Sequence, residues 1–163
     1  MTTTVKPSPL DPRFVSLLWA GPERAEEIAG LHARLFDPAW DVKSVMASLE
    51  HPGSTALVVM AGDPKQFAGF ILGQLAADEA EILSIGVAPE FQRRGLGKRL
   101  VEGLARAAKR AESRRLFLEV ASDNDAASGL YLCLGFQPIG GRKGYYQRQG
   151  GPPADAINLA LTL

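Results

Sequence analysis

The sequence has few of the residues that bind structural metals or form disulfides. Its 163 residues include one cysteine, Cys133, and two histidines, His32 and His51. A single cysteine excludes an internal disulfide framework, and these side chains are too few for the usual structural zinc site. We therefore expect no metal centre, and the low cysteine content fits a reducing cytoplasm.

An excess of charge and a long apolar run are also missing. The chain carries 18 basic and 18 acidic side chains, so it lacks the broad positive field that non-specific nucleic-acid binding requires. No apolar stretch approaches the roughly 18 residues of a membrane span, and the N-terminus lacks the basic-then-apolar pattern of a signal peptide. These absences predict a soluble cytoplasmic protein that binds neither nucleic acid nor membranes.

What remains is the composition of one globular domain. Apolar residues make up 46% of the chain and charged residues 22%, and 163 residues suffice for one sizeable core but not for two ordinary domains. Met1–Arg13 contains several threonines and prolines without apolar periodicity, which predicts a flexible N-terminal arm. Residues 14–163 are expected to form the single domain.

Apolar periodicity in this domain predicts alternating strands and helices. Leucines and alanines line one face of Gly95–Glu112, as in an amphipathic helix, and Asn124 and Gly135 are suited to start and end another helix. The order of elements requires a right-handed parallel crossover, so we expect an α/β (α+β) fold with a mixed sheet flanked by helices. The strands are expected at residues 14–19, 55–60, 67–75, 81–88, 116–121, 137–146 and 157–163, and the helices at 22–35, 41–49, 95–112 and 124–135.

Residues 92–99, QRRGLGKR, break a local rule at the start of a predicted helix. A helix N-terminus carries partial positive charge and unpaired N–H groups, and it normally attracts acidic residues. Here four cations stand instead, namely Arg93, Arg94, Lys98 and Arg99. An anionic ligand such as a diphosphate would compensate them, and the two glycines would let it approach the backbone. The spacing fits neither a dinucleotide fingerprint nor a P-loop, and a solvated basic turn is the alternative.

The sequence resembles one family at several motifs in order. Residues 92–97, QRRGLG, resemble the Gln/Arg-x-x-Gly-x-Gly/Ala signature of the GCN5-related N-acetyltransferase (GNAT) family. Residues 82–87, ILSIGV, with Pro89 resemble the family's fourth strand, and Leu118–Val120 resemble its fifth. The helix that follows shares Asn124, Ala127, Tyr131 and Gly135–Phe136 with the family.

The resemblance extends over about residues 14–163 and is most specific for one branch of the family. Its densest part is similar to bacterial acetyltransferases that act on the N-termini of ribosomal proteins. The residues that carry this similarity are Trp40, Arg142, Tyr145–Tyr146 and Asp155–Ala156.

The resemblance implies a mixed, mostly antiparallel sheet that splays between its fourth and fifth strands, with acetyl-CoA in the gap. Backbone groups of the fourth strand would meet the pantetheine arm, and the Val87 N–H would polarise the thioester carbonyl. The basic loop would bind the diphosphate. The coenzyme-binding residues so implied are Ile85, Gly86, Val87, Gln92, Arg93, Arg94, Gly95, Leu96, Gly97, Lys98 and Asn124.

Two residues are candidates for proton transfer. Glu119 interrupts an apolar strand that we expect to be covered on both faces, where a carboxylate is unfavourable without a partner. By resemblance it is the general base that deprotonates the substrate ammonium, and Tyr131 is the general acid that protonates the coenzyme A thiolate. The alternatives are a solvent-facing carboxylate and a core tyrosine.

The acceptor is the least specified part of the prediction. By resemblance, Phe36, Trp40, Tyr145 and Tyr146 line its channel, although each could be a packing residue. The expected acceptor is the N-terminal α-amine of a protein or peptide. Gly86 stands where the family has alanine and Ala121 where N-terminal acetyltransferases often have arginine, so a small amine or a lysine side chain stays open. A non-catalytic module that senses acetyl-CoA is the alternative from another class.

Overall fold

The computed structural model describes residues 9–163, and residues 1–8 of the predicted arm lie outside the described residues. The last part of that arm contacts the domain. Leu10 packs against the hydrophobic core and its backbone N–H lies 3.5 Å from the Arg94 carbonyl oxygen, while Pro12–Phe14 form a short 3-10 helix. Contacts with the domain therefore begin before residue 14.

The predicted alternation of strands and helices is confirmed, with shifts of up to three residues at the ends. The largest shifts are at the first helix, which starts at Ala25 after a 3-10 turn at Pro22–Arg24, and at the last strand, which starts at Ala154 because this residue pairs with Tyr146 on the neighbouring strand. The strands are β1 (Val15–Trp19), β2 (Ser54–Ala61), β3 (Gln66–Ala76), β4 (Glu79–Val87), β5 (Arg115–Ala121), β6 (Gln137–Tyr146) and β7 (Ala154–Thr162), and the helices are α1 (Ala25–Leu35), α2 (Val42–Glu50), α3 (Leu96–Arg110) and α4 (Asp125–Cys133).

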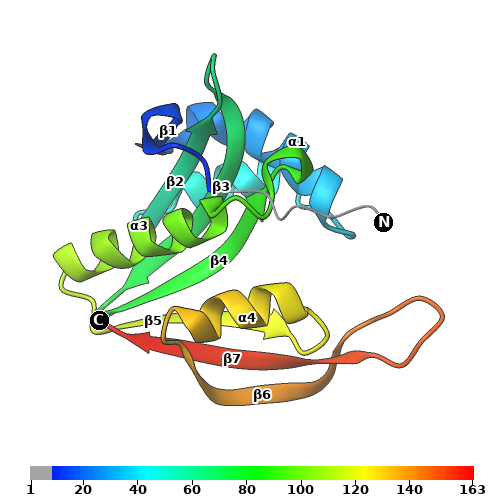
Figure 1. Cartoon of the computed structure of the whole chain (residues 1–163). Helices are drawn as coiled ribbons and strands as arrows, with labels where there is room; N and C mark the ends of the chain where they lie inside the picture. The colour runs from blue at the N-terminus through cyan, green and yellow to red at the C-terminus, as the bar shows by residue number, and fades with distance from the viewer. Residues whose placement is uncertain (1–8) are drawn as a thin grey trace.

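The strands form one mixed sheet in the order β1-β2-β3-β4-β5-β7-β6. Every neighbouring pair is antiparallel except β4 and β5, which are parallel. These two strands pair only where Glu79–Glu81 lie beside Arg115–Phe117, and beyond that point they separate (Figure 1). The predicted splay between the fourth and fifth strands is therefore confirmed.

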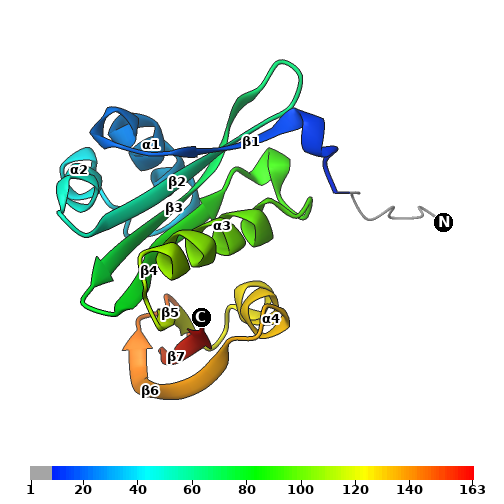
Figure 2. The same ribbon diagram turned by 90° about the vertical axis from the view of Figure 1, so that its left-hand side faces the viewer.

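Helices cover both faces of the larger half of the sheet. Figure 2 shows α1 and α2 on one face of β2–β4 and α3 on the other, with α4 beside β5 and β7. The amphipathic pattern predicted for α3 is confirmed, since its leucines Leu96, Leu100 and Leu104 are buried. Within residues 9–163, none of the helices has both the length and the apolar character needed to cross a membrane.

Candidate active site

The N-terminus of α3 is uncapped and begins after a left-handed turn. Gly95 precedes the helix in the left-handed conformation, with φ of 83°, and Arg93 is also left-handed, with φ of 64°. No side chain caps this end, and its first turn contains no acidic residue. The first hydrogen bond of the helix runs from the Arg99 N–H to the Gly95 carbonyl, at 3.2 Å. The preceding N–H groups of residues 96–98 are therefore directed out of the helix.

Gly97 leaves an open approach to these N–H groups. A β-carbon built on Gly97 would meet only the Leu130 side chain, at an ordinary contact distance of 3.5 Å. Protein packing therefore does not require a glycine here, whereas a ligand lying close to the backbone would. The same contact places α4, the helix that carries Tyr131, alongside the first turn of α3.

The end of β4 directs peptide groups into the gap. The Ala88 N–H donates to the Ala68 carbonyl of the β3 side at 2.8 Å, so residue 88 faces β3. Backbone groups alternate along an antiparallel strand, and those of Val87 therefore face the opposite way, toward the separated β5. The Gln92 side-chain amide donates a hydrogen bond to the Val87 carbonyl at 2.9 Å. Gln92 thus fastens the basic loop to β4, and the Val87 N–H points into the gap.

Gly86 is explained by packing on the α1 side of the sheet. A β-carbon there would lie 2.7 Å from the Leu35 side chain and 2.9 Å from the Phe70 ring. An alanine, which the family resemblance led us to expect, would require these side chains to move. The departure at residue 86 therefore reflects the packing beneath β4.

Two of the predicted acceptor residues gather around a buried histidine. The His32 ring lies 4.4 Å from the Phe36 ring centroid and 5.2 Å from that of Trp40, and its Nδ1 accepts a hydrogen bond from the Trp40 N–H at 3.0 Å. Burial lowers the pKa of His32, so this ring is neutral at physiological pH. Phe36 and Trp40 therefore pack on α1, close to Phe70 and the end of β4.

Glu119 is not covered by a helix, which corrects the expectation that its strand is covered on both faces. Leu118 and Val120 are buried on one face of β5, while Glu119 lies on the other with 21% of its side chain exposed. Its partner comes from β6. The Arg142 guanidinium donates to both Glu119 oxygens at 2.8–3.0 Å, and these hydrogen bonds raise the pKa of Arg142. The guanidinium also stacks over the Tyr145 ring, 3.8 Å from its centroid.

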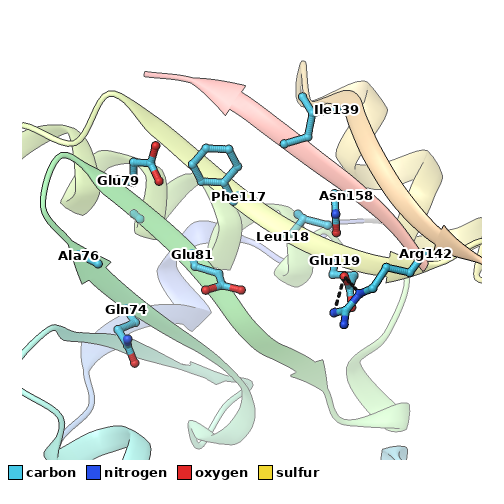
Figure 3. A pocket seen from close by; sticks show the side chains of 11 residues that line it. Gln74, Ala76, Glu79, Glu81, Phe117, Leu118, Glu119, Ile139, Arg142 and Asn158 are labelled. Carbon is cyan, nitrogen blue, oxygen red and sulfur yellow. Dashed lines mark hydrogen bonds and ion pairs between the residues drawn. The ribbon is translucent and has the colours of Figure 1, made fainter. Parts of the chain in front are cut away.

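A pocket of about 390 Å³ opens beside this ion pair, on the strand face that carries Glu119 (Figure 3). It is acidic. Arg115 pairs with Glu79 at 3.4 Å and Arg142 with Glu119, whereas Glu81 has no ion pair within the described part of the chain. The pocket is lined by Gln74, Ala76, Glu79, Ala80, Glu81, Phe117, Leu118, Glu119, Ile139, Arg142 and Asn158.

Of the predicted site residues, only Glu119 lines this pocket. Sequence reasoning missed the other two carboxylates, although Glu79-Ala80-Glu81-Ile82 alternates acidic and apolar residues and so places both acids on one face of a strand. Tyr145 and Tyr146 lie nearby on β6, with ring centroids 5.1 Å apart.

Tyr131 is a buried residue of α4. The residue is 4% exposed, its ring centroid lies 5.5 Å from that of Phe136 in an edge-on arrangement, and burial raises its pKa to about 12. Asn124 caps the same helix as predicted, since its Oδ1 accepts from the Ala127 N–H at 3.2 Å. The described residues contain no group of three or more histidine, cysteine or acidic side chains that could hold a metal ion.

A splayed parallel strand pair beside an uncapped helix N-terminus, with a carboxylate across the gap, is the arrangement that the family resemblance implied. The fold thus matches that of the N-acetyltransferases, a class of acyltransferases. The sequence profile of the acetyltransferase (GNAT) family matches residues 17–136, and the chain belongs to this family.

Relatives with established names agree with this assignment. The chain is 36% identical over 139 residues to the N-alpha-acetyltransferase RimI of Mycobacterium tuberculosis, which covers 83% of this chain and 84% of the relative. It is 39% identical over 98 residues to the [ribosomal protein bS18]-alanine N-acetyltransferase of Escherichia coli, with coverage of 60% and 66%.

Solved structures share the fold. A crystal structure of the ribosomal-protein-S18-alanine N-acetyltransferase from Escherichia coli superposes with a TM-score of 0.82 at 29% identity, over 91% of this chain and 93% of the other. NAA60 of Arabidopsis thaliana, solved in complex with acetyl-CoA, superposes with a TM-score of 0.78 at 16% identity, over 91% and 98% of the two chains.

Proposed function

We propose that this protein transfers the acetyl group of acetyl-CoA directly to the N-terminal α-amine of a protein or peptide. The observation that carries the proposal is the gap between β4 and β5. On one side it meets the uncapped N-terminus of α3, which suits a diphosphate, and on the other it meets Glu119 and the acidic pocket, which suit an ammonium group.

The α3 side would hold the coenzyme. The N–H groups of residues 96–98 and the cations of the basic loop complement the charge of a diphosphate, and the open space at Gly97 lets it reach the backbone. Along β4, the backbone groups of Ile85 and Val87 would meet the pantetheine arm beside Gly86, and Asn124 would contact the coenzyme from the start of α4.

The proposed chemistry uses Glu119, the Val87 N–H and Tyr131. Glu119 accepts a proton from the acceptor ammonium, through one water, because only the neutral amine attacks the thioester. The Val87 N–H stabilises the negative charge that develops on the thioester oxygen, a contact worth on the order of 3 kcal/mol of barrier in other enzymes. Tyr131 stays protonated at neutral pH because its pKa is raised to about 12, and so it can donate its O–H to the departing thiolate.

An α-amine suits this site better than a lysine side chain. The reference pKa is near 8 for an α-amine and 10.4 for lysine, so at pH 7 about a tenth of the former is neutral but under a thousandth of the latter. A single carboxylate acting through water suits the easier deprotonation. The relatives named above as N-alpha-acetyltransferases support the same choice, and Tyr145 and Tyr146 would contact the first residues of the acceptor.

Release of free thiol from acetyl-CoA tests the proposal with three acceptors. These are a peptide with a free N-terminus, a matched peptide with a blocked N-terminus and an internal lysine, and a small polyamine. We expect rapid release with the first only. Equal rates with the blocked peptide, or reaction of the polyamine alone, would refute the α-amine assignment. Tight acetyl-CoA binding without thiol release from any acceptor would favour a non-catalytic sensor.

A further inference from the structure

Arg142 is held in place by its contacts with Glu119 and Tyr145. Its guanidinium donates to both carboxylate oxygens and borders the acidic pocket (Figure 3). It also stacks on the Tyr145 ring. Arg142 and Glu119 lie 23 positions apart in sequence and on strands that are not neighbours in the sheet, since β7 lies between β5 and β6. The arrangement therefore depends on the path of β6.

An irregularity in β6 sets that path. Arg142 pairs with Ala156 and Tyr146 with Ala154, so three residues of β6 lie opposite Asp155 alone. The Gly144 N–H donates to the Asp155 carboxylate at 2.8 Å, and Gly144 adopts a left-handed φ of 61° that few other residues tolerate. Such bulges re-aim side chains next to active sites. Here the bulge follows directly after Arg142 and contains Tyr145, on which the guanidinium stacks.

We propose that Arg142 is a positioning residue that fixes the carboxylate of Glu119 for proton transfer at the acceptor end of the gap. The guanidinium contacts both oxygens of the carboxylate through two of its nitrogens, Nε and Nη2, in the planar two-oxygen arrangement. This two-oxygen contact holds the carboxylate in one orientation, and the lone pairs that Arg142 does not occupy stay available to a water or an amine. The inference rests on the proposed acetyl transfer and adds a residue to it.

A second ion pair, between Arg115 and Glu79, provides a control for this role. Arg115 pairs with Glu79 at the other end of the same pocket, but through one contact of 3.4 Å between side chains that are each about half exposed. Its removal changes the charge around the pocket as the removal of Arg142 does, yet it leaves Glu119 in place. Arg142 is itself 54% exposed, so its replacement is not expected to unfold the protein.

The test is a double-mutant cycle in steady-state kinetics with a free-N-terminus peptide. Arg142→Gln should lower kcat by about 10- to 100-fold, as displaced catalytic groups do, and leave the KM for acetyl-CoA unchanged. Arg142→Lys should recover little activity, because an ammonium group lacks the planar two-oxygen contact. Arg115→Gln should stay within about twofold of the wild type.

The decisive comparison is in a Glu119→Gln background, where Arg142→Gln should have no further effect on kcat. Wild-type kcat in Arg142→Gln, or an equal loss in the presence and absence of the Glu119 carboxylate, would overturn the positioning role while the acetyltransferase assignment stands. If the wild-type protein acetylates no amine at all, the proposed function fails, and the positioning role fails with it.

Discussion

The two sides of the gap between β4 and β5 are built in different ways. The α3 side consists of backbone N–H groups and cations from one continuous stretch, residues 92–99, which a turn and a helix start bring together. The acceptor side consists of side chains from β3, β4, β5, β6 and β7. A site made from consecutive backbone is visible in the sequence, whereas a site made from distant side chains appears only when the sheet is assembled.

The two sides also differ in charge. The helix N-terminus and the basic loop present positive charge, while Glu79, Glu81 and Glu119 make the pocket at the closed end of the gap acidic. This polarity matches the two proposed substrates, an anionic diphosphate on one side and an ammonium group on the other. Changes on one side should therefore affect binding of the coenzyme and changes on the other should affect catalysis.

The largest expected effect lies on the acceptor side. Glu119→Gln keeps the shape of the side chain but removes the base, so turnover with a free-N-terminus peptide should fall by roughly 10² to 10⁴. Direct titration should show an unchanged dissociation constant for acetyl-CoA, because Glu119 does not border the diphosphate loop. Wild-type turnover would mean that another group accepts the proton.

Gly97→Glu should produce the opposite result on the coenzyme side. Its side chain would occupy the open approach to α3 and place a negative charge beside the diphosphate, so acetyl-CoA should bind roughly 100-fold more weakly. Calorimetric titration measures this change, and circular dichroism verifies that the variant is folded. An unaltered dissociation constant in the folded variant would locate the diphosphate elsewhere.

The burial of Tyr131 can be tested through the pH dependence of the protein's stability. Its pKa is raised from 10.0 to about 12 by burial, so above pH 10 the unfolded chain loses the proton that the folded protein keeps. The associated stability is fully present below pH 10 and is lost as the pH rises toward 12.

Relative to Tyr131→Phe, the wild type should therefore lose about 1 kcal/mol of unfolding free energy per pH unit above pH 10. Denaturant unfolding at pH 9 to 11 measures the difference. The same variant should lower turnover less than Glu119→Gln, since water can also protonate the thiolate. Parallel stability curves for the two proteins would show that the phenol is not buried in solution.

The smallest expected effect is that of Gly97→Ala, which should change the stability of the protein and its affinity for acetyl-CoA in opposite directions. Gly97→Ala should stabilise the protein by about 0.5–1 kcal/mol, because alanine is the better helix former and its β-carbon meets only Leu130 at 3.5 Å. The same methyl group should weaken acetyl-CoA binding severalfold. Thermal unfolding and titration of this variant should thus move in opposite directions. Unchanged affinity together with higher stability would indicate that no ligand approaches Gly97.

This contrast also accounts for what could be predicted from the sequence. The strands and helices were accessible because apolar periodicity marked each of them, whereas the splay between the fourth and fifth strands was expected only from the family resemblance. The basic loop stood out because its cations oppose the helix dipole. The pairing of Glu119 with Arg142 could not be predicted from the sequence. Arg142 reaches Glu119 from β6, on the far side of β7, and its position depends on an irregularity opposite Asp155. The need for glycine at residue 86 could not be predicted either, because Leu35 and Phe70 approach it only in the folded protein.

The central claim is that one gap joins a coenzyme side to an α-amine side. A conjugate of coenzyme A joined through an acetyl bridge to the α-amine of a short peptide tests it most directly, by calorimetric titration of the wild-type protein. We predict that this conjugate binds at least about 100-fold more tightly than coenzyme A alone, because its two parts occupy both sides at once. An affinity no higher than that of coenzyme A, or a larger gain for a conjugate joined through a lysine side chain, would contradict the account.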